Sequence, residues 1–135
     1  PDGLEKVLTA ARGITENSLI CVFGCGGNRD REKRPLMGET VQRLSDLCII
    51  TSDNPRDENP EDIIADILAG ADRAGKSHIA IPDRKKALLF ALRIAHEGDT
   101  VVIAGKGAEK YMEIKGEKIP FNDKEICEEY LGRRN

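Results

Sequence analysis

Short apolar runs alternate with amphipathic stretches along the chain. The runs at 18–23, 47–52, 78–81 and 100–104 are four to six residues long and almost continuously apolar. Strands that helices cover on both faces have this pattern, because neither face needs polar side chains. In the stretches between these runs, apolar residues recur at the spacing of a helix face. We therefore expect helices at residues 4–13, 35–45, 61–71, 84–96 and 123–132.

The order of these elements predicts the fold class. Alternating strands and helices argue for an α/β domain with a mostly parallel sheet and helices on both sides. Near the end of the chain, residues 111–115 and 117–121 flank Gly116 and are typical of a hairpin, or of an edge strand with a turn. The length of 135 residues fits one domain, and neither a linker nor an internal repeat divides the sequence.

Composition narrows the possible partners. Charged residues make up 33% of the chain and aromatic residues 4%, and the net charge is -3. This balance disfavours a general nucleic-acid binder or a membrane-surface protein, and the apolar runs are too short to cross a bilayer. We expect no signal peptide, and the four cysteines form no CxxC pair and no Cys/His cluster with zinc spacing. We expect a cytoplasmic protein with free thiols, no metal site, no nucleic-acid partner and no membrane insertion.

Three loops that follow strands carry the candidate chemistry. They cover residues 24–34, 53–56 and 105–109. Because the carboxyl ends of parallel strands lie at the same edge of a sheet, these loops should meet. The sequence therefore predicts that they share a rim, which is where such sheets bind ligands.

The second loop is the most specific of the three. It follows an apolar run directly and reads Asp53, Asn54, Pro55 and Arg56. Proline disfavours the helical region for the preceding residue, so we expect Asn54 to be extended. The guanidinium of Arg56 offers a planar set of donors suited to a carboxylate. These residues indicate a site for a small zwitterion.

Each loop also has a purely structural interpretation. The glycines of the first loop match neither GxGxxG nor the P-loop pattern, and they fit a tight strand-to-helix connection. Arg29 is either an anion ligand or a solvated side chain, and we expect Arg31, Lys33 and Arg34 on an exposed charged face. The Asx-Pro pair of the second loop is typical of a turn. The third loop fits a surface turn, or a site in which Glu109 accepts an ammonium group.

Three motifs, taken together, resemble one protein family. They are VFGCGGNRDREKRPLMG, TSDNPRDENPEDIIADIL and AGKGAEKY, and the opening PDGLEKVL fits the same pattern. In this order and spacing they are similar to the C-terminal domain of the Mur ligases, nearest to the MurE type that adds meso-diaminopimelate. The resemblance covers essentially all of residues 1–135. It implies a Rossmann-like three-layer α/β sandwich, whose mostly parallel sheet has an antiparallel strand near the C-terminus.

The resemblance also implies a function. Family members form an acyl phosphate from ATP and a substrate carboxylate, with magnesium assisting, and the amine of the incoming amino acid then attacks it. This chain would be the domain that binds meso-diaminopimelate in the ligase that extends UDP-N-acetylmuramoyl dipeptide during peptidoglycan synthesis. We expect the UDP-substrate domain and the central ATPase domain to be absent from this chain. We therefore expect no catalytic residue, no bound cofactor and no ligase activity in this fragment alone.

Two other classes of function compete with this interpretation. The first is a free-standing Rossmann-like module that binds a small ligand or regulates another protein. The second is a small independent nucleotide-dependent enzyme, which the lack of a complete phosphate-binding fingerprint disfavours. A reading frame that continues upstream into a P-loop would favour the ligase.

The resemblance assigns site residues position by position. Within the family the DNPR form goes with meso-diaminopimelate, which has one carboxylate more than lysine, and Arg56 would pair with that carboxylate. Arg29 would bind a carboxylate, and Glu109 would meet the ammonium of the distal centre. The turn with Asn28 and Asp30 would approach the nucleotide. The implied ligands of the amino acid are Arg29, Asp53, Asn54, Pro55, Arg56, Gly105 and Glu109.

The chain departs from the family pattern at two positions. Ala108 stands where a histidine is usual, which leaves the role of that histidine open. Asn28 stands where an aspartate is common, which removes one negative charge beside Arg29.

Overall fold

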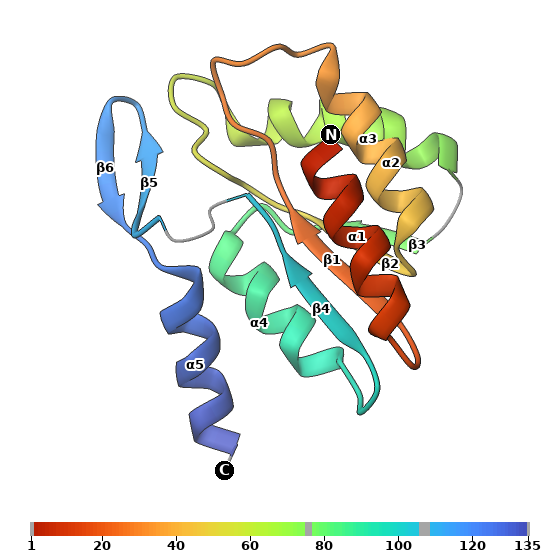
Figure 1. Ribbon diagram of the computed structural model, residues 1–135. Coiled ribbons are helices and arrows are strands. Elements are labelled where there is room, and N and C mark those ends of the chain that lie inside the picture. Colours follow the sequence, from red (N-terminus) through yellow and green to blue (C-terminus); the bar gives the residue numbers. More distant parts are fainter. Residues whose placement is uncertain (1, 75–76, 106–108, 135) are drawn as a thin grey trace.

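Four parallel strands form the sheet at the centre of the molecule (Figure 1). The computed structural model describes residues 2–74, 77–105 and 109–134. The strand order is β3-β2-β1-β4, and every pairing in this sheet is parallel. The strands are β1 (Leu19–Phe23), β2 (Leu47–Ile50), β3 (Ser77–Ala80) and β4 (Thr100–Ile103).

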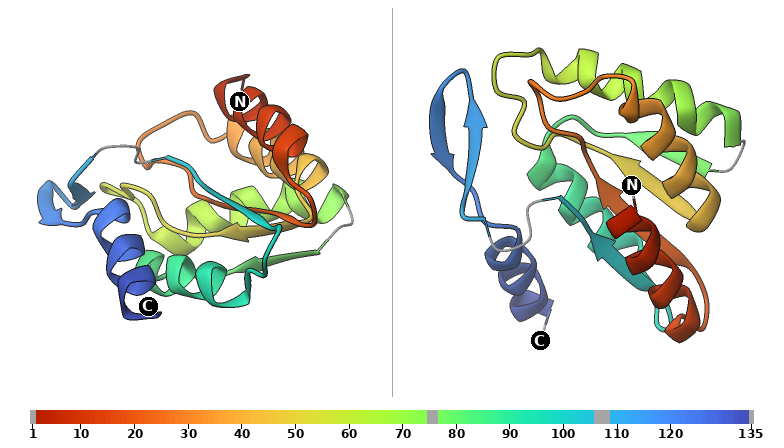
Figure 2. Two further views of the ribbon diagram at one scale, coloured as in Figure 1. Left: turned by 60° about the horizontal axis from the view of Figure 1, so that its bottom comes forward. Right: turned by 45° about the horizontal axis from the view of Figure 1, so that its top comes forward.

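Helices cover both faces of the sheet, as the continuously apolar strands predict (Figure 2). All five residues of β1 are buried. Leu19, Cys21 and Phe23 join the core beneath α1 (Asp2–Ile14), α2 (Lys33–Leu44) and α3 (Pro60–Ala74). Ile20 and Val22 join a second core with α4 (Arg84–Ile94), against which α5 (Asp123–Arg134) packs. The predicted three-layer α/β fold is confirmed.

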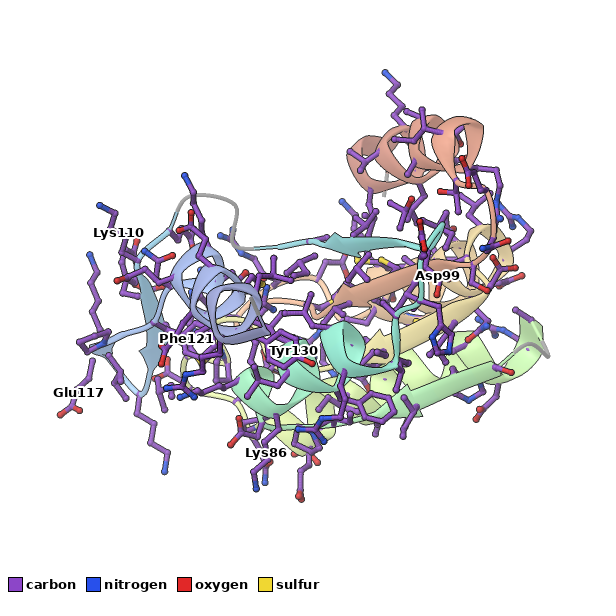
Figure 3. The ribbon with its side chains drawn as sticks, turned by 90° about the horizontal axis from the view of Figure 1, so that it is seen from below. Lys86, Asp99, Lys110, Glu117, Phe121 and Tyr130 are labelled. Atoms are coloured by element: carbon purple, nitrogen blue, oxygen red, sulfur yellow. The ribbon has the colours of Figure 1, made fainter. Side chains whose placement is uncertain are left out.

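The antiparallel strands form a hairpin outside the parallel sheet. In the described part of the chain, β5 (Tyr111–Ile114) and β6 (Glu117–Pro120) form a separate two-stranded sheet. Figure 3 shows Lys110 and Glu117 at the outer edge of this hairpin. The expected antiparallel strand near the C-terminus is therefore present, but it does not extend the main sheet. An isolated parallel bridge between Arg56 and Ile114 joins the hairpin to the second loop instead.

The helix ends differ slightly from the sequence prediction. Gly13 does not end the first helix, which continues to Ile14. Asp83 caps α4 as expected, because its Oδ1 accepts a hydrogen bond from the amide of Lys86 at 3.1 Å. That helix ends at Ile94, two residues before the expected end at His96. No helix in the described part of the chain is long and apolar enough to cross a membrane.

The four cysteines are free thiols, as predicted. Cys21 and Cys48 are buried side by side on β1 and β2, whereas Cys25 and Cys127 are partly exposed. Burial raises the pKa of the Cys21 thiol to about 12, because an apolar surrounding disfavours the thiolate. These features are typical of packing residues rather than of reactive thiols.

Candidate functional site

The three loops meet at one edge of the sheet, which confirms the predicted rim. The amide of Gly27, in the first loop, donates to the carbonyl of Asn54 in the second at 2.9 Å. A Cβ atom on Gly27 would lie 1.8 Å from the carbonyl oxygen of Pro55, so only glycine permits this approach. A Cβ on Gly105, in the third loop, would lie 2.5 Å from Oδ2 of Asp53. The first and third loops thus both contact the second loop closely.

The backbone of the second loop is left-handed at two positions. Asn54 has φ +42° and Arg56 has φ +53°, so the expectation of an extended Asn54 was wrong. Asparagine tolerates this region better than most residues, and hydrogen bonds to the hairpin compensate the cost of the left-handed backbone. The amide of Arg56 donates to the carbonyl of Glu113 in β5 at 2.9 Å, and its carbonyl accepts from the amide of Lys115, just after β5, at 2.7 Å. Tertiary contacts therefore override the preference that Pro55 imposes.

Asn54 connects the second loop to the third loop and to the hairpin. The residue is 7% exposed. Its Nδ2 donates to Oε1 of Glu109 at 3.2 Å, and its Oδ1 accepts from the amide of Glu113 at 3.0 Å. The side-chain amide thus serves to hold the site together and to orient the Glu109 carboxylate.

Arg56 lies at the hairpin with its guanidinium partly engaged. Its Nε donates to Oε2 of Glu113 at 2.9 Å, and its Nη1 donates to the carbonyl of Gly27 at 2.9 Å. Arg56 and Glu113 keep side-chain exposures of 23% and 31%, so both reach the surface. A small hollow of about 150 Å³ beside them is lined by Asn28, Arg56, Asp57, Glu113 and Gly116. No sequence pattern pointed to a role for Glu113, because it is the contact with Arg56 that reveals one.

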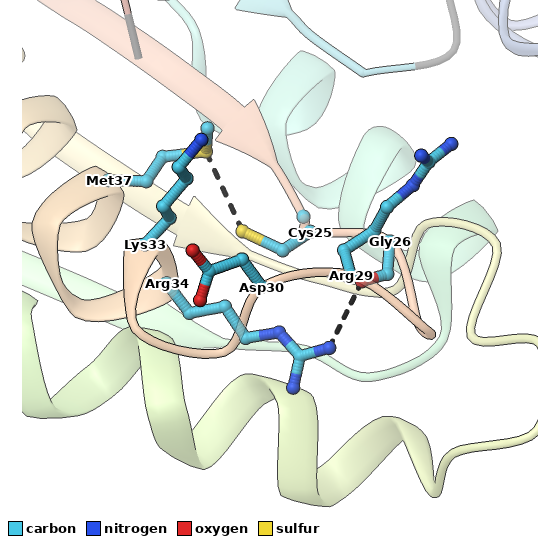
Figure 4. A pocket seen from close by; sticks show the side chains of 8 residues that line it. Cys25, Gly26, Arg29, Asp30, Lys33, Arg34 and Met37 are labelled. Atoms are coloured by element: carbon cyan, nitrogen blue, oxygen red, sulfur yellow. Dashed lines mark hydrogen bonds between the residues drawn. The ribbon is translucent and has the colours of Figure 1, made fainter.

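The first loop borders a second, larger hollow of about 290 Å³ (Figure 4). Its lining includes Arg29 and Asp30, two of the predicted site residues. Arg29 is exposed, and its side chain makes no hydrogen bond or ion pair within the described residues. Asp30 accepts a hydrogen bond from the amide of Glu32 at 3.0 Å, at the start of α2. Asn28 is held away from this hollow, because its Nδ2 donates to Asp57 at 3.0 Å.

Arg34 is buried, so its expected place on an exposed charged face was wrong. In Figure 4 its side chain points toward α3, whereas Arg29 points the other way. It donates to both carboxylate oxygens of Glu58, at 3.0 and 2.8 Å, to Asp66 at 3.0 Å and to the carbonyl of Gly26 at 3.1 Å. Hydrogen bonding to Arg34 holds the pKa of Glu58 below its ordinary value. Arg34 therefore ties the first loop to the segment behind the second.

Arg84 joins the strand ends beneath the rim, and it too escaped sequence reasoning. Its Nε and Nη2 bond to both oxygens of Asp123, at 2.9 and 2.7 Å. Nη1 donates to the carbonyl of Ser52 at 3.0 Å, and Nη2 also donates to the carbonyl of Ala104 at 3.1 Å. Those carbonyls directly precede the second and third loops. One buried guanidinium thus fixes the spacing of two loops and anchors the start of α5.

Some of the predicted features lie beyond what the structure describes. Residues 106–108, which include Ala108, are outside the described residues. Within the described residues, no group of three or more histidine, cysteine or acidic side chains is placed to hold a metal ion.

Comparison with known proteins identifies the family. The family described as "Mur ligase, glutamate ligase domain" matches residues 1–107, which is most of the chain. This chain belongs to the Mur ligase family. The match includes the first two loops of the Mur ligase domain and Gly105 of the third.

Two relatives of the Mur ligase domain share one name. The proteins called UDP-N-acetylmuramoyl-L-alanyl-D-glutamate--2,6-diaminopimelate ligase from Syntrophomonas wolfei and Aquifex aeolicus are 52% and 56% identical to it over 132 residues. These alignments cover 97% and 98% of this chain, and 27% of each relative. A solved structure of a ligase with that name matches with a TM-score of 0.94 and 44% identity, over 99% of this chain and 28% of the other. The chain therefore spans about a quarter of the length of these relatives.

Proposed function

We propose that this chain is the amino-acid-binding domain of a longer, ATP-dependent ligase. That enzyme would join meso-diaminopimelate to UDP-N-acetylmuramoyl-L-alanyl-D-glutamate in the bacterial cytoplasm, as a step of peptidoglycan synthesis. The UDP-substrate domain, the ATPase domain and the site for Mg²⁺ would lie in other parts of the longer protein. The names of the relatives and their greater length support this assignment.

The observation that carries the proposal is the mixture of charges on the rim. Arg56 lines a hollow beside the second loop, the Glu109 carboxylate accepts from Asn54, and the Asp53 carboxylate lies against Gly105. A zwitterion with two carboxylates and two ammonium groups requires donors and acceptors placed in this way. We assign the distal carboxylate to Arg56 and an ammonium group to Glu109, with Arg29 available for another carboxylate.

The domain would contribute binding and orientation rather than bond making. ATP, bound elsewhere, would supply the activation of the dipeptide carboxylate. Asp53 and Glu109 would hold ammonium groups, and Asn54 would fix the position of the Glu109 carboxylate. Such placement directs one amine of the amino acid toward the activated carboxylate, which lowers the entropic part of the barrier.

Amino-acid selection by the full-length protein tests the assignment. We expect ADP release that depends on meso-diaminopimelate and the UDP-linked dipeptide, with lysine a poor substitute. Arg56→Ala should lower kcat/KM for meso-diaminopimelate by about a hundredfold, because hydrogen bonds to a charged group are worth roughly 1.5–3 kcal/mol. The KM for ATP should not change. An unchanged KM for meso-diaminopimelate would refute the role of Arg56.

A matched control is available on the opposite side of the fold. Arg12 forms an exposed ion pair with Asp46 at 2.9 Å, beside the amino ends of β1 and β2. Arg12→Ala should leave both KM values unchanged. A free-standing binding module would instead show no turnover in any full-length form.

A further inference from the structure

Glu113 contacts the second loop through both its main chain and its side chain. The carbonyl of Glu113 accepts from the amide of Arg56 at 2.9 Å. The amide of Glu113 donates to Oδ1 of Asn54 at 3.0 Å. Its Oε2 accepts from Nε of Arg56 at 2.9 Å. The position of Glu113 is therefore fixed before its side chain reaches the guanidinium.

This contact leaves part of the Arg56 guanidinium available. Nε bonds to Glu113, and Nη1 bonds to the carbonyls of Gly27 at 2.9 Å and Asn54 at 3.4 Å. Nη2 makes no hydrogen bond within the described part of the chain. A free arginine side chain samples many rotamers, and ordering it on binding opposes affinity. Here the plane of the guanidinium is fixed on two edges while one nitrogen stays open beside the hollow.

We propose that Glu113 is a positioning residue that sets the selectivity of Arg56 for a second carboxylate on the amino-acid substrate. This inference rests on the proposed function. Glu113 orients Arg56 in advance, so the substrate carboxylate meets donors that are already in place. The competing possibility is that Glu113 only occupies the position of the substrate carboxylate and is displaced by it. The two possibilities predict opposite changes in substrate affinity when Glu113 is removed. Loss of an orienting group weakens substrate binding, whereas loss of a competitor strengthens it.

The test is steady-state kinetics of the full-length protein with meso-diaminopimelate and with lysine. We expect Glu113→Ala to raise the KM for meso-diaminopimelate about tenfold. This is the smallest effect expected from losing a hydrogen bond to a charged group, because the Arg56–Glu113 pair is partly exposed. The kcat, the KM for ATP and the slow use of lysine should not change. Glu113→Gln keeps an acceptor for Nε and should restore most of the affinity. Glu117→Ala, on the outer edge of the same hairpin, is the matched control and should resemble the wild type.

Several results would overturn the inference. A lower KM in Glu113→Ala would mean displacement, and an unchanged KM would mean no role. Adding Glu113→Ala to Arg56→Ala should cause no further loss, and a further tenfold loss would show that Glu113 acts independently of Arg56. Should Glu113→Ala fail to fold, Glu113→Asp, which keeps the charge but shortens the reach, should still raise the KM. A wild-type protein that does not use meso-diaminopimelate would overturn the proposed function itself, and this inference with it.

Discussion

Replacing Arg84 with methionine should destabilise the fold strongly. Methionine preserves much of the side-chain volume and the helix propensity, so the main loss is the charge and its hydrogen bonds. The side chains of Arg84 and Asp123 are 0% and 9% exposed. Without Arg84, the Asp123 carboxylate remains buried without its ion pair, and the carbonyls of Ser52 and Ala104 lose a donor.

The magnitude follows from this burial. Removing one partner of a buried ion pair costs about 3–5 kcal/mol of unfolding free energy. Domains are typically stable by roughly 5–15 kcal/mol, so the variant should lie close to the unfolding threshold. With a urea m-value of about 2 kcal/mol/M, the midpoint of unfolding should fall by about 2 M.

Urea unfolding followed by circular dichroism measures the effect. Arg133→Met is the matched control, because Arg133 and Glu129 form an ion pair with side-chain exposures of 78% and 61%. Exposed pairs contribute little, so its midpoint should stay near that of the wild type. Combining Arg84→Met with Asp123→Leu should recover part of the loss, since no buried charge remains unpaired. A midpoint for Arg84→Met equal to that of Arg133→Met would refute the reasoning.

Two further predictions concern the first loop. Gly27→Ala should destabilise the protein by several kcal/mol, since its Cβ would lie 1.8 Å from the carbonyl oxygen of Pro55. A Cβ on Gly3 would meet nothing within 4 Å, so the control Gly3→Ala should be neutral or stabilising. Thermal melting of both variants measures the difference. The pKa of Glu58 is lower in the folded protein than its ordinary value of 4.5, so the ionised carboxylate stabilises the fold at any pH above 4.5. This contribution should be lost progressively as the pH falls below 4.5. Unfolding free energies between pH 7 and pH 3 should therefore fall less steeply in Arg34→Met, and equal slopes would contradict the role of that pair.

Much of the fold could be predicted from local patterns. The apolar runs predicted the four strands of the sheet and the helices on both of its faces, because a strand buried on both sides has apolar residues at nearly every position. The three loops could be placed on one rim, because parallel strands align their carboxyl ends. The hairpin around Gly116 could be predicted, but its attachment to Arg56 could not, since that bridge joins segments far apart in the sequence.

Sequence reasoning failed where a distant partner decides the environment of a charged or polar residue. Arg34 lies in a charged stretch that is typical of an exposed helix start, and the distant carboxylates of Glu58 and Asp66 make its burial possible. Asn54 precedes a proline, and its contacts with the first loop, the third loop and the hairpin hold it in the left-handed region.

The sequence by itself determined which residue types stand at the carboxyl ends of the strands, and its motifs determined the family. The tertiary structure decided how those residues are held. Glu113 lies 57 positions from Arg56 and Asp123 lies 39 positions from Arg84, yet each pair forms a direct ion pair. Periodicity reports only which face of an element is buried, whereas charge pairing depends on which elements the topology brings together.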